Sequence, residues 1–229
     1  MVVSKGNLPV YLRITLDYRI RGRVKITMFD YIEEIITAFE KASPGKHSTK
    51  STAAPVNIFV WDKDCKKLNQ NKVLAFHNLV TKTLYATKRS RPDTCTSISF
   101  FIMRVREPDE DDWEKLVFLM RYLTSTRTLN LILFANGSGI LKWWVDAYFV
   151  VFPIMRGHPR GGLSIGRGFP IVGSTKQKLN SRSSTETDIV GVVELITAIF
   201  WTKYFLESQG CNVQDNRLLQ ANKSSNILE

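Results

Sequence analysis

Apolar residues recur at the spacing of an α-helix in four long segments of the chain. This period predicts helices over 29–42, 69–88, 107–123 and 184–209. Ser43-Pro44-Gly45 ends the first and Gly210 the last, while Pro92 suits the first turn of a further helix. In the second helix the predicted stripe consists of Val73, Leu74, His77, Val80 and Leu84.

Shorter segments alternate apolar with polar residues, or are rich in β-branched and aromatic side chains, as strands are. They lie at 11–20 and 24–28, joined by a turn at 21–23, and again at 142–152, 161–168, 169–177 and 216–220. After residue 140 the predicted order is three antiparallel strands, a helix, a further strand and, after residue 220, the start of another helix. The pattern therefore predicts a mixed α/β fold.

Acidic residues are concentrated just before the third predicted helix, between Glu107 and Asp112. Negative side chains stabilise the positive end of a helix dipole, and the apolar residues of the helix begin at Trp113. We interpret this acidic run as helix capping and not as a metal site.

The 229-residue chain has a formal net charge of +11. Cationic side chains gain affinity for polyanions by displacing counterions from phosphates, so the charge favours a nucleic-acid partner. The segment between Asp146 and Glu186 has no acidic residue but six basic ones: Arg156, Arg160, Arg167, Lys176, Lys178 and Arg182.

Cysteines and histidines are scattered and stand at no zinc-ligand or disulfide spacing, which favours a reduced intracellular protein. The first residues lack the apolar core and cleavage site of a secretory signal. The most apolar segment, 189–201, contains Glu194 and falls short of the roughly 20 apolar residues that span a bilayer. No membrane association is therefore expected.

One carboxylate, Asp146, lies in the middle of the apolar segment KWWVDAYFVVF at 142–152. An ionised carboxylate in a half-buried strand is costly unless something positive pairs with it. Lys142, Arg156, a neighbouring backbone donor and a metal ion are the candidates.

Several blocks of the chain, taken in order, resemble the Pol polyprotein of copia-type long-terminal-repeat retrotransposons. They are YLRITLDY, KITMFDYIEEI, KRSRPDTCTSISF, DDWEKLVFLMRYLTSTR, WWVDAYFVV, STKQKLNSRSSTETDIV and NKSSNILE. The resemblance implies a reverse-transcriptase thumb and connection region over 11–139 and a truncated ribonuclease H-like domain over 140–229, with 1–10 unmatched. The Tyr-x-Asp-Asp turn of the polymerase site does not occur in the sequence, so polymerase activity is not expected.

The same resemblance implies where a ribonuclease H site would lie. In that family carboxylates hold two magnesium ions, and the matching positions here are Asp146 in the strand and Asp188 in the helix. The third position falls on Ala221, and the fourth belongs to a later helix that the sequence does not reach. Two carboxylates should bind Mg²⁺ weakly, so a catalytically degenerate site is expected.

Asp188 has a second interpretation, because it stands three residues after Thr185, just as Glu186 stands three after Ser183. Either acid suits a capping box at the helix start. The basic residues nearby are either a solvated face or a phosphate-binding groove, and we expect the groove. They are Arg160, Lys176, Lys178 and Arg182.

Two glycines of the family are replaced, by Arg13 and by Ser125. Glycine at such points often supplies a conformation that other residues resist. These departures, like the missing carboxylate at Ala221, suggest relaxed constraint on a decayed copy of the element.

The expected function is that of a non-catalytic retrotransposon fragment that binds RNA–DNA hybrid or other nucleic acid. One alternative is a weakly active, metal-dependent ribonuclease H. Another is a part of a longer, active Pol polyprotein. The expected partners are nucleic acid and other element-encoded polypeptides, in the cytoplasm or the nucleus.

Overall fold

The computed structural model describes residues 6–45, 48–60, 62, 64–148, 158–164, 168, 170–174 and 182–220. Side chains are described for these residues except 147–148, 158–162 and 171–174. The chain forms two compact units. The first comprises Met1–Arg19 and Lys25–Leu131, and the second comprises Ile20–Val24 and Ile132–Glu229.

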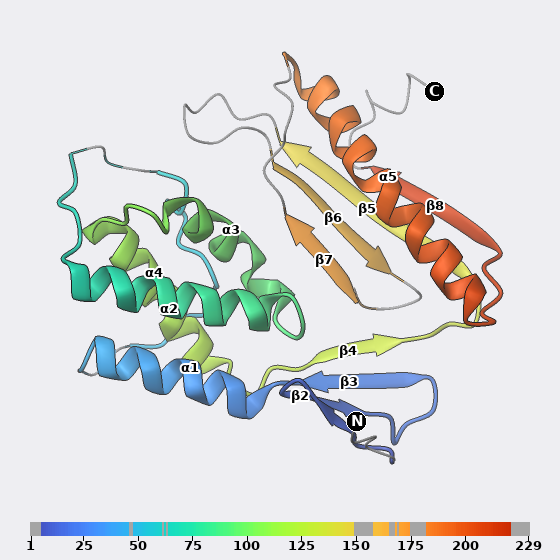
Figure 1. Ribbon diagram of the computed structural model, residues 1–229, viewed down its shortest axis with the longest axis horizontal. Helices are drawn as coiled ribbons and strands as arrows, with labels where there is room; N and C mark the ends of the chain where they lie inside the picture. The colour runs from blue at the N-terminus through green and yellow to red at the C-terminus, as the bar shows by residue number, and fades with distance from the viewer. Residues whose placement is uncertain are drawn as a thin grey trace. The chain divides into compact units, whose positions relative to one another are not determined.

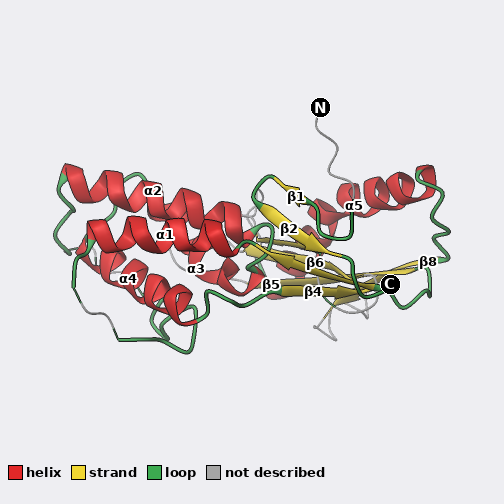
Figure 2. Cartoon of the chain, turned by 90° about the horizontal axis from the view of Figure 1, so that it is seen from below, coloured by secondary structure: helices red, strands yellow, loops and turns green. Residues whose placement is uncertain are grey.

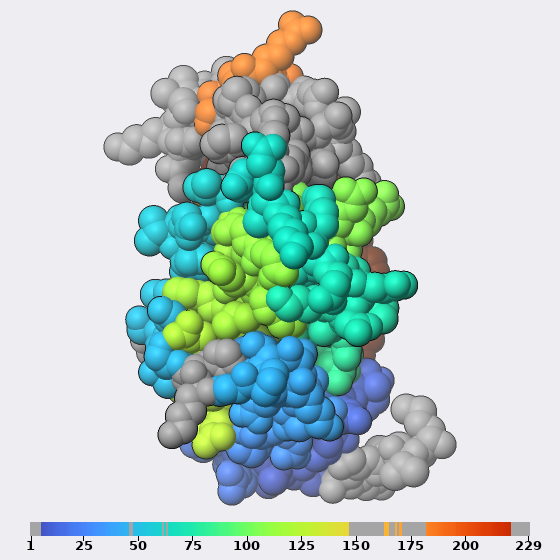
Figure 3. Space-filling model, turned by 90° about the vertical axis from the view of Figure 1, so that its left-hand side faces the viewer, coloured from blue at the N-terminus to red at the C-terminus, as the bar shows by residue number. Residues whose placement is uncertain are grey.

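Helices form the larger part of the first unit (Figures 1 and 2). They are α1 (Phe29–Ala42), α2 (Gln70–Thr87), α3 (Cys95–Arg104) and α4 (Glu110–Ser125), with a 3₁₀ turn at Pro92–Thr94. Phe76 and Phe101 meet edge to face in the core, with ring centroids 5.7 Å apart, and both are fully buried. Burial of one such ring contributes about 2 kcal/mol. Figure 3 shows α1 (blue), α2 (teal) and α4 (yellow-green) packed together on one face of this unit.

The buried stripe of α2 differs from the predicted one. Leu74 is 63% exposed, and the buried residues include Phe76, Thr83 and Thr87. The two threonines tolerate burial because their hydroxyls donate to carbonyl oxygens one turn earlier, at 2.7 and 2.8 Å. Of the predicted stripe, Val80 is buried, whereas Leu74 and His77 are exposed, so the prediction was wrong in part about which face packs inward.

A small antiparallel meander precedes α1. It consists of β1 (Val10–Tyr11), β2 (Ile14–Asp17) and β3 (Arg23–Thr27). Tyr11 pairs with Ile14, so Leu12 and Arg13 form a two-residue hairpin loop. Both residues have positive φ, 49° and 65°, as the two central residues of a type I′ turn do.

The second unit contains a four-stranded sheet in the order β7-β6-β5-β8 (Figure 1), and β4 (Leu131–Phe134) precedes it. β5 (Ile140–Tyr148) pairs antiparallel with β6 (His158–Ser164), and β6 pairs antiparallel with β7 (Ile171–Ser174). β8 (Asp215–Gln220) is parallel to β5. Parallel pairing requires a crossover connection, which α5 (Ser184–Ser208) provides.

This architecture confirms the predicted mixed α/β fold, including the order of three antiparallel strands, a helix and a further strand. β4 was not predicted. Two parts of the prediction lie outside the described residues. They are residues 149–152 of the strand predicted at 142–152, and the helix expected to start after residue 220. The predicted domain limits at 10, 139 and 229 stay a prediction.

α5 covers one face of the sheet and contacts β5 and β6 (Figure 1). Leu141 and Trp143 of β5 and Leu163 of β6 are buried beneath it. The helix ends as predicted at Gly210, whose φ is 79°. Two backbone bonds of 3.0 Å, from Gly210 to Glu207 and from Cys211 to Leu206, complete a Schellman motif at this end.

By length and composition, α5 is long and apolar enough to cross a membrane. It has 25 residues, and an 18-residue window within it has a mean hydropathy of 1.6. Only 11% of that window is buried. The apolar length predicted from residues 189–201 was too short, because the apolar side chains continue through Tyr204, Phe205 and Leu206. The inner face of the helix nevertheless packs on the sheet.

Candidate functional site

Asp146 lies on β5 with its side chain exposed. Leu141, Trp143 and Val145 are buried on the α5 side of this strand, at 1 to 2% exposed. Because side chains alternate along a strand, Asp146 lies on the opposite face, together with the 48% exposed Trp144. Water can solvate a carboxylate there, so the expected cost of a half-buried charge does not arise.

Arg160 of β6 stands directly opposite Asp146 in the antiparallel register. Cross-strand pairs of opposite charge contribute roughly 0.2–1 kcal/mol. Only the backbone of Arg160 is described, and Arg156, another candidate partner, lies outside the described residues. Among the described side chains, none forms an ion pair with Asp146, and this includes Lys142.

Asp188 lies in the second turn of α5 and is 1% exposed. The N-cap of this helix is Ser183, whose hydroxyl accepts the Glu186 backbone N–H at 3.1 Å. The Glu186 carboxylate in turn accepts the backbone N–H of Arg182 at 2.5 Å. Ser183 and Glu186 therefore cap the N-terminus of α5. The pairing of Asp188 with Thr185 in a capping box is wrong, because Thr185 is already inside the helix.

The two predicted carboxylates lie on different elements, the exposed Asp146 on β5 and the buried Asp188 on α5. Asp188 belongs to the buried side of α5, which packs on the face of the sheet that bears Trp143, whereas Asp146 lies on the other face. Mg²⁺ requires oxygen ligands around a single point at about 2.0–2.1 Å. Within the described part of the chain, no group of three or more His, Cys, Asp or Glu side chains could hold a metal ion. Magnesium binding by Asp146 and Asp188 stays a prediction.

The predicted basic groove is described only in part. Arg182 is exposed just before α5, and Arg160 lies on β6 with its backbone described. Lys176, Lys178 and Ala221 lie outside the described residues. The groove therefore stays a prediction.

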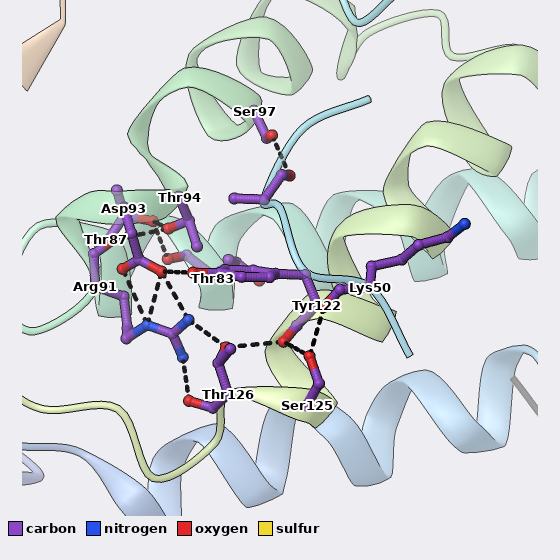
Figure 4. Close-up of polar contacts among 11 residues, drawn as sticks. Lys50, Thr83, Thr87, Arg91, Asp93, Thr94, Ser97, Tyr122, Ser125 and Thr126 are labelled. Atoms are coloured by element: carbon purple, nitrogen blue, oxygen red, sulfur yellow. Dashed lines mark hydrogen bonds and ion pairs between the residues drawn. The ribbon is translucent and has the colours of Figure 1, made fainter. Parts of the chain in front are cut away.

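Sequence reasoning missed a buried arginine in the first unit (Figure 4). Arg91 is 1% exposed, and its guanidinium donates to the Asp93 carboxylate at 2.7 Å and to the Thr126 hydroxyl at 2.7 Å. The Tyr122 hydroxyl donates to the same carboxylate at 2.7 Å. Burial, and then this hydrogen bond, raise the pKa of Tyr122. The sequence signal that could have indicated this ion pair is the short segment Arg91-Pro92-Asp93, which places an arginine two residues before an aspartate.

A second buried arginine explains the acidic run before α4. Arg104 donates to Asp109 at 2.6 Å and to Asp112 at 2.9 Å. Asp109 and Asp112 also form a full capping box, each carboxylate accepting the other residue's backbone N–H. The interpretation as helix capping is confirmed. Burial raises the pKa of Asp112 to about 6, against the opposing effect of its backbone hydrogen bond and of Arg104.

Comparison with known proteins points to a mobile genetic element. No protein-family model matches the chain. It is 26% identical over 191 residues to the Retrovirus-related Pol polyprotein from transposon TNT 1-94 of Nicotiana tabacum, a match that covers 81% of this chain and 14% of that polyprotein. A solved structure, that of the foamy viral protease-reverse transcriptase dRH in complex with ds DNA, aligns with a TM-score of 0.43 at 11% identity. This alignment covers 96% of the present chain and 32% of the viral one. The chain is thus a distant relative of a retrotransposon Pol polyprotein and spans a small part of its length.

Proposed function

We propose that this chain is a catalytically degenerate fragment of a copia-type reverse transcriptase and ribonuclease H, and that it retains nucleic-acid binding. Residues 11–139 correspond in this proposal to the thumb and connection region, and residues 140–229 to the front of a ribonuclease H-like domain. Its ligand is an RNA–DNA hybrid or another duplex, held through phosphates and sugar hydroxyls.

The observation that carries the proposal is the loss of the carboxylate at the third matching position, which is Ala221. The distant similarity to a Pol polyprotein and the β7-β6-β5-β8 order with its α5 crossover support a ribonuclease H relationship for the second unit. Of the matching carboxylate positions, Asp146 is exposed on β5 and Asp188 is buried on α5, but the third position is Ala221. Two carboxylates should bind Mg²⁺ more weakly than the full set of ligands, which supports a loss of catalysis.

Charge supports the retained binding. The chain has a net charge of +11, and no acid interrupts the six basic residues between Asp146 and Glu186. Phosphate contacts need no catalytic geometry, because cations displace counterions wherever they approach the backbone closely. Nucleic-acid binding therefore tolerates the loss of a carboxylate, whereas catalysis does not.

The test is to incubate the full chain with an RNA–DNA hybrid labelled on its RNA strand, in Mg²⁺ and separately in Mn²⁺. We expect a mobility shift without cleavage, and the same shift for Asp146→Asn and Asp188→Asn. Cleavage that both substitutions abolish would instead establish the alternative, a weakly active ribonuclease H. Absence of any shift at low salt would refute nucleic-acid binding.

A further inference from the structure

The outer face of α5 is apolar along most of its length. The face is defined here by seven exposed side chains: Ile189, Val193, Ile196, Phe200, Trp201, Tyr204 and Phe205. Their exposed fractions run from 42% for Ile189 to 62% for Trp201. Since the inner face of the same helix packs on the sheet, α5 is apolar on both sides. A helix with this pattern needs a second apolar surface against its outer side.

The aromatic residues of this outer face are ordered among themselves. The rings of Trp201 and Phe205 stack nearly parallel, 6° apart, with centroids separated by 5.1 Å. Phe200 and Tyr204 stack in the same way at 6.2 Å. Four aromatic side chains, each about half exposed, leave roughly 400 Å² accessible to a partner. With the aliphatic residues added, the area approaches the roughly 800 Å² per partner that a stable interface buries.

The charges of α5 argue against a lipid surface as the occupant. The helix carries Glu186, Asp188, Glu194 and Glu207 but only one basic residue, Lys203. Helices that lie on membrane surfaces are typically rich in Lys and Arg, which attract anionic lipid headgroups. The acidic balance of this helix favours a protein partner.

We propose that the outer face of α5 binds the same face of a second copy of this chain in an antiparallel, two-fold symmetric pair. The C-terminal half of the face carries the four aromatic residues, and the N-terminal half carries the smaller Ile189, Val193 and Ile196. An antiparallel pair packs large side chains against small ones, whereas a parallel pair would bring aromatic against aromatic and leave gaps elsewhere. Opposed helix dipoles favour the same arrangement.

Sedimentation equilibrium of the full chain tests the proposal. We expect a mass twice that of the 26.2 kDa chain at micromolar concentration. Trp201→Glu should weaken dimerisation at least tenfold, whereas Leu74→Glu should change it less than twofold. Leu74 is the matched control, since it is an apolar helix residue that is 63% exposed on α2. Val193→Glu serves as a second variant if circular dichroism shows that Trp201→Glu does not fold.

Cross-linking tests the orientation. Thr197 is exposed at the centre of the face, so a two-fold antiparallel pair places it beside its own copy. In a Cys211→Ser background, Thr197→Cys should form a covalent dimer under oxidation. Ser208→Cys should not, because antiparallel packing puts its two copies about 33 Å apart along the helices.

Several outcomes would overturn the proposal. The proposal is wrong if the chain sediments as a monomer at every concentration. It is also wrong if Trp201→Glu and Leu74→Glu weaken dimerisation equally, or if cysteines at positions 197 and 208 cross-link equally well. Binding of the monomer to phosphatidylcholine vesicles that depends on Trp201 would show that the face is a lipid-binding surface instead.

Discussion

At the scale of single residues, Leu12 and Arg13 hold a backbone conformation that side chains with a Cβ resist. Their positive φ values lie in the left-handed region, which costs roughly 1–2 kcal/mol for a residue other than glycine. The resemblance to a glycine-containing motif singled out Arg13 for this reason. Ser125 was singled out in the same way, but it ends α4 without a positive φ, and its hydroxyl donates to the Lys50 carbonyl at 2.7 Å.

We predict that Arg13→Gly is more stable than Arg13→Ala by about 1 kcal/mol. Both substitutions remove the ion pair with Glu34 and the stacking on Tyr31, so their difference isolates the backbone conformation. Denaturant unfolding of the two variants measures this difference. Equal stabilities would mean that the hairpin relaxes to negative φ at no cost.

Asp112 is the residue whose titration should be visible in stability. Its pKa is raised to about 6 by burial, from an ordinary value of 3.8. Between these values the folded state binds the proton more tightly than the unfolded state, so the free energy of unfolding falls as the pH rises. Relative to Asp112→Asn, the wild type should lose about 2 kcal/mol between pH 4 and pH 7, and no more above pH 7. A difference that is constant over this range would contradict the raised pKa.

At the scale of elements, periodicity and capping residues predicted most of what the structure contains. The acidic run before Trp113 predicted the start of α4, and Gly210 predicted the end of α5, because both signals act through the backbone of their own helix. The strand at β4 escaped prediction, since four residues are too few for a period to be distinguished.

Which face of a helix or strand packs inward was harder to predict than the helix or strand itself. The predicted α2 stripe included the exposed Leu74 and omitted the buried Thr83 and Thr87, because a hydroxyl satisfied by its own helix is as compatible with burial as a methyl group. The face of β5 that bears Asp146 likewise depends on where α5 packs, which is a tertiary property. Even the resemblance could indicate only which positions to compare, and not whether they converge.

At the scale of the whole molecule, the net charge of +11 is the feature that links the two units to one proposed ligand. Charge is a weak guide to fold but a direct guide to association with polyanions. Catalysis needs several oxygens within a fraction of an ångström, whereas counterion release needs only a sufficient number of cations near phosphates. A decayed copy should therefore lose the first property long before the second.

The salt dependence of binding follows from this difference. If the chain neutralises about four phosphates, its affinity for an RNA–DNA hybrid should fall roughly a hundredfold between 50 and 200 mM salt, with a logarithmic slope near −3.6. Fluorescence anisotropy with a labelled hybrid measures the slope, and Asp146→Asn should leave it unchanged. A hybrid with uncharged methylphosphonate linkages is the control and should not bind. If binding is insensitive to salt, or equally tight to the uncharged analogue, contacts other than phosphates hold the ligand and the charge argument is wrong.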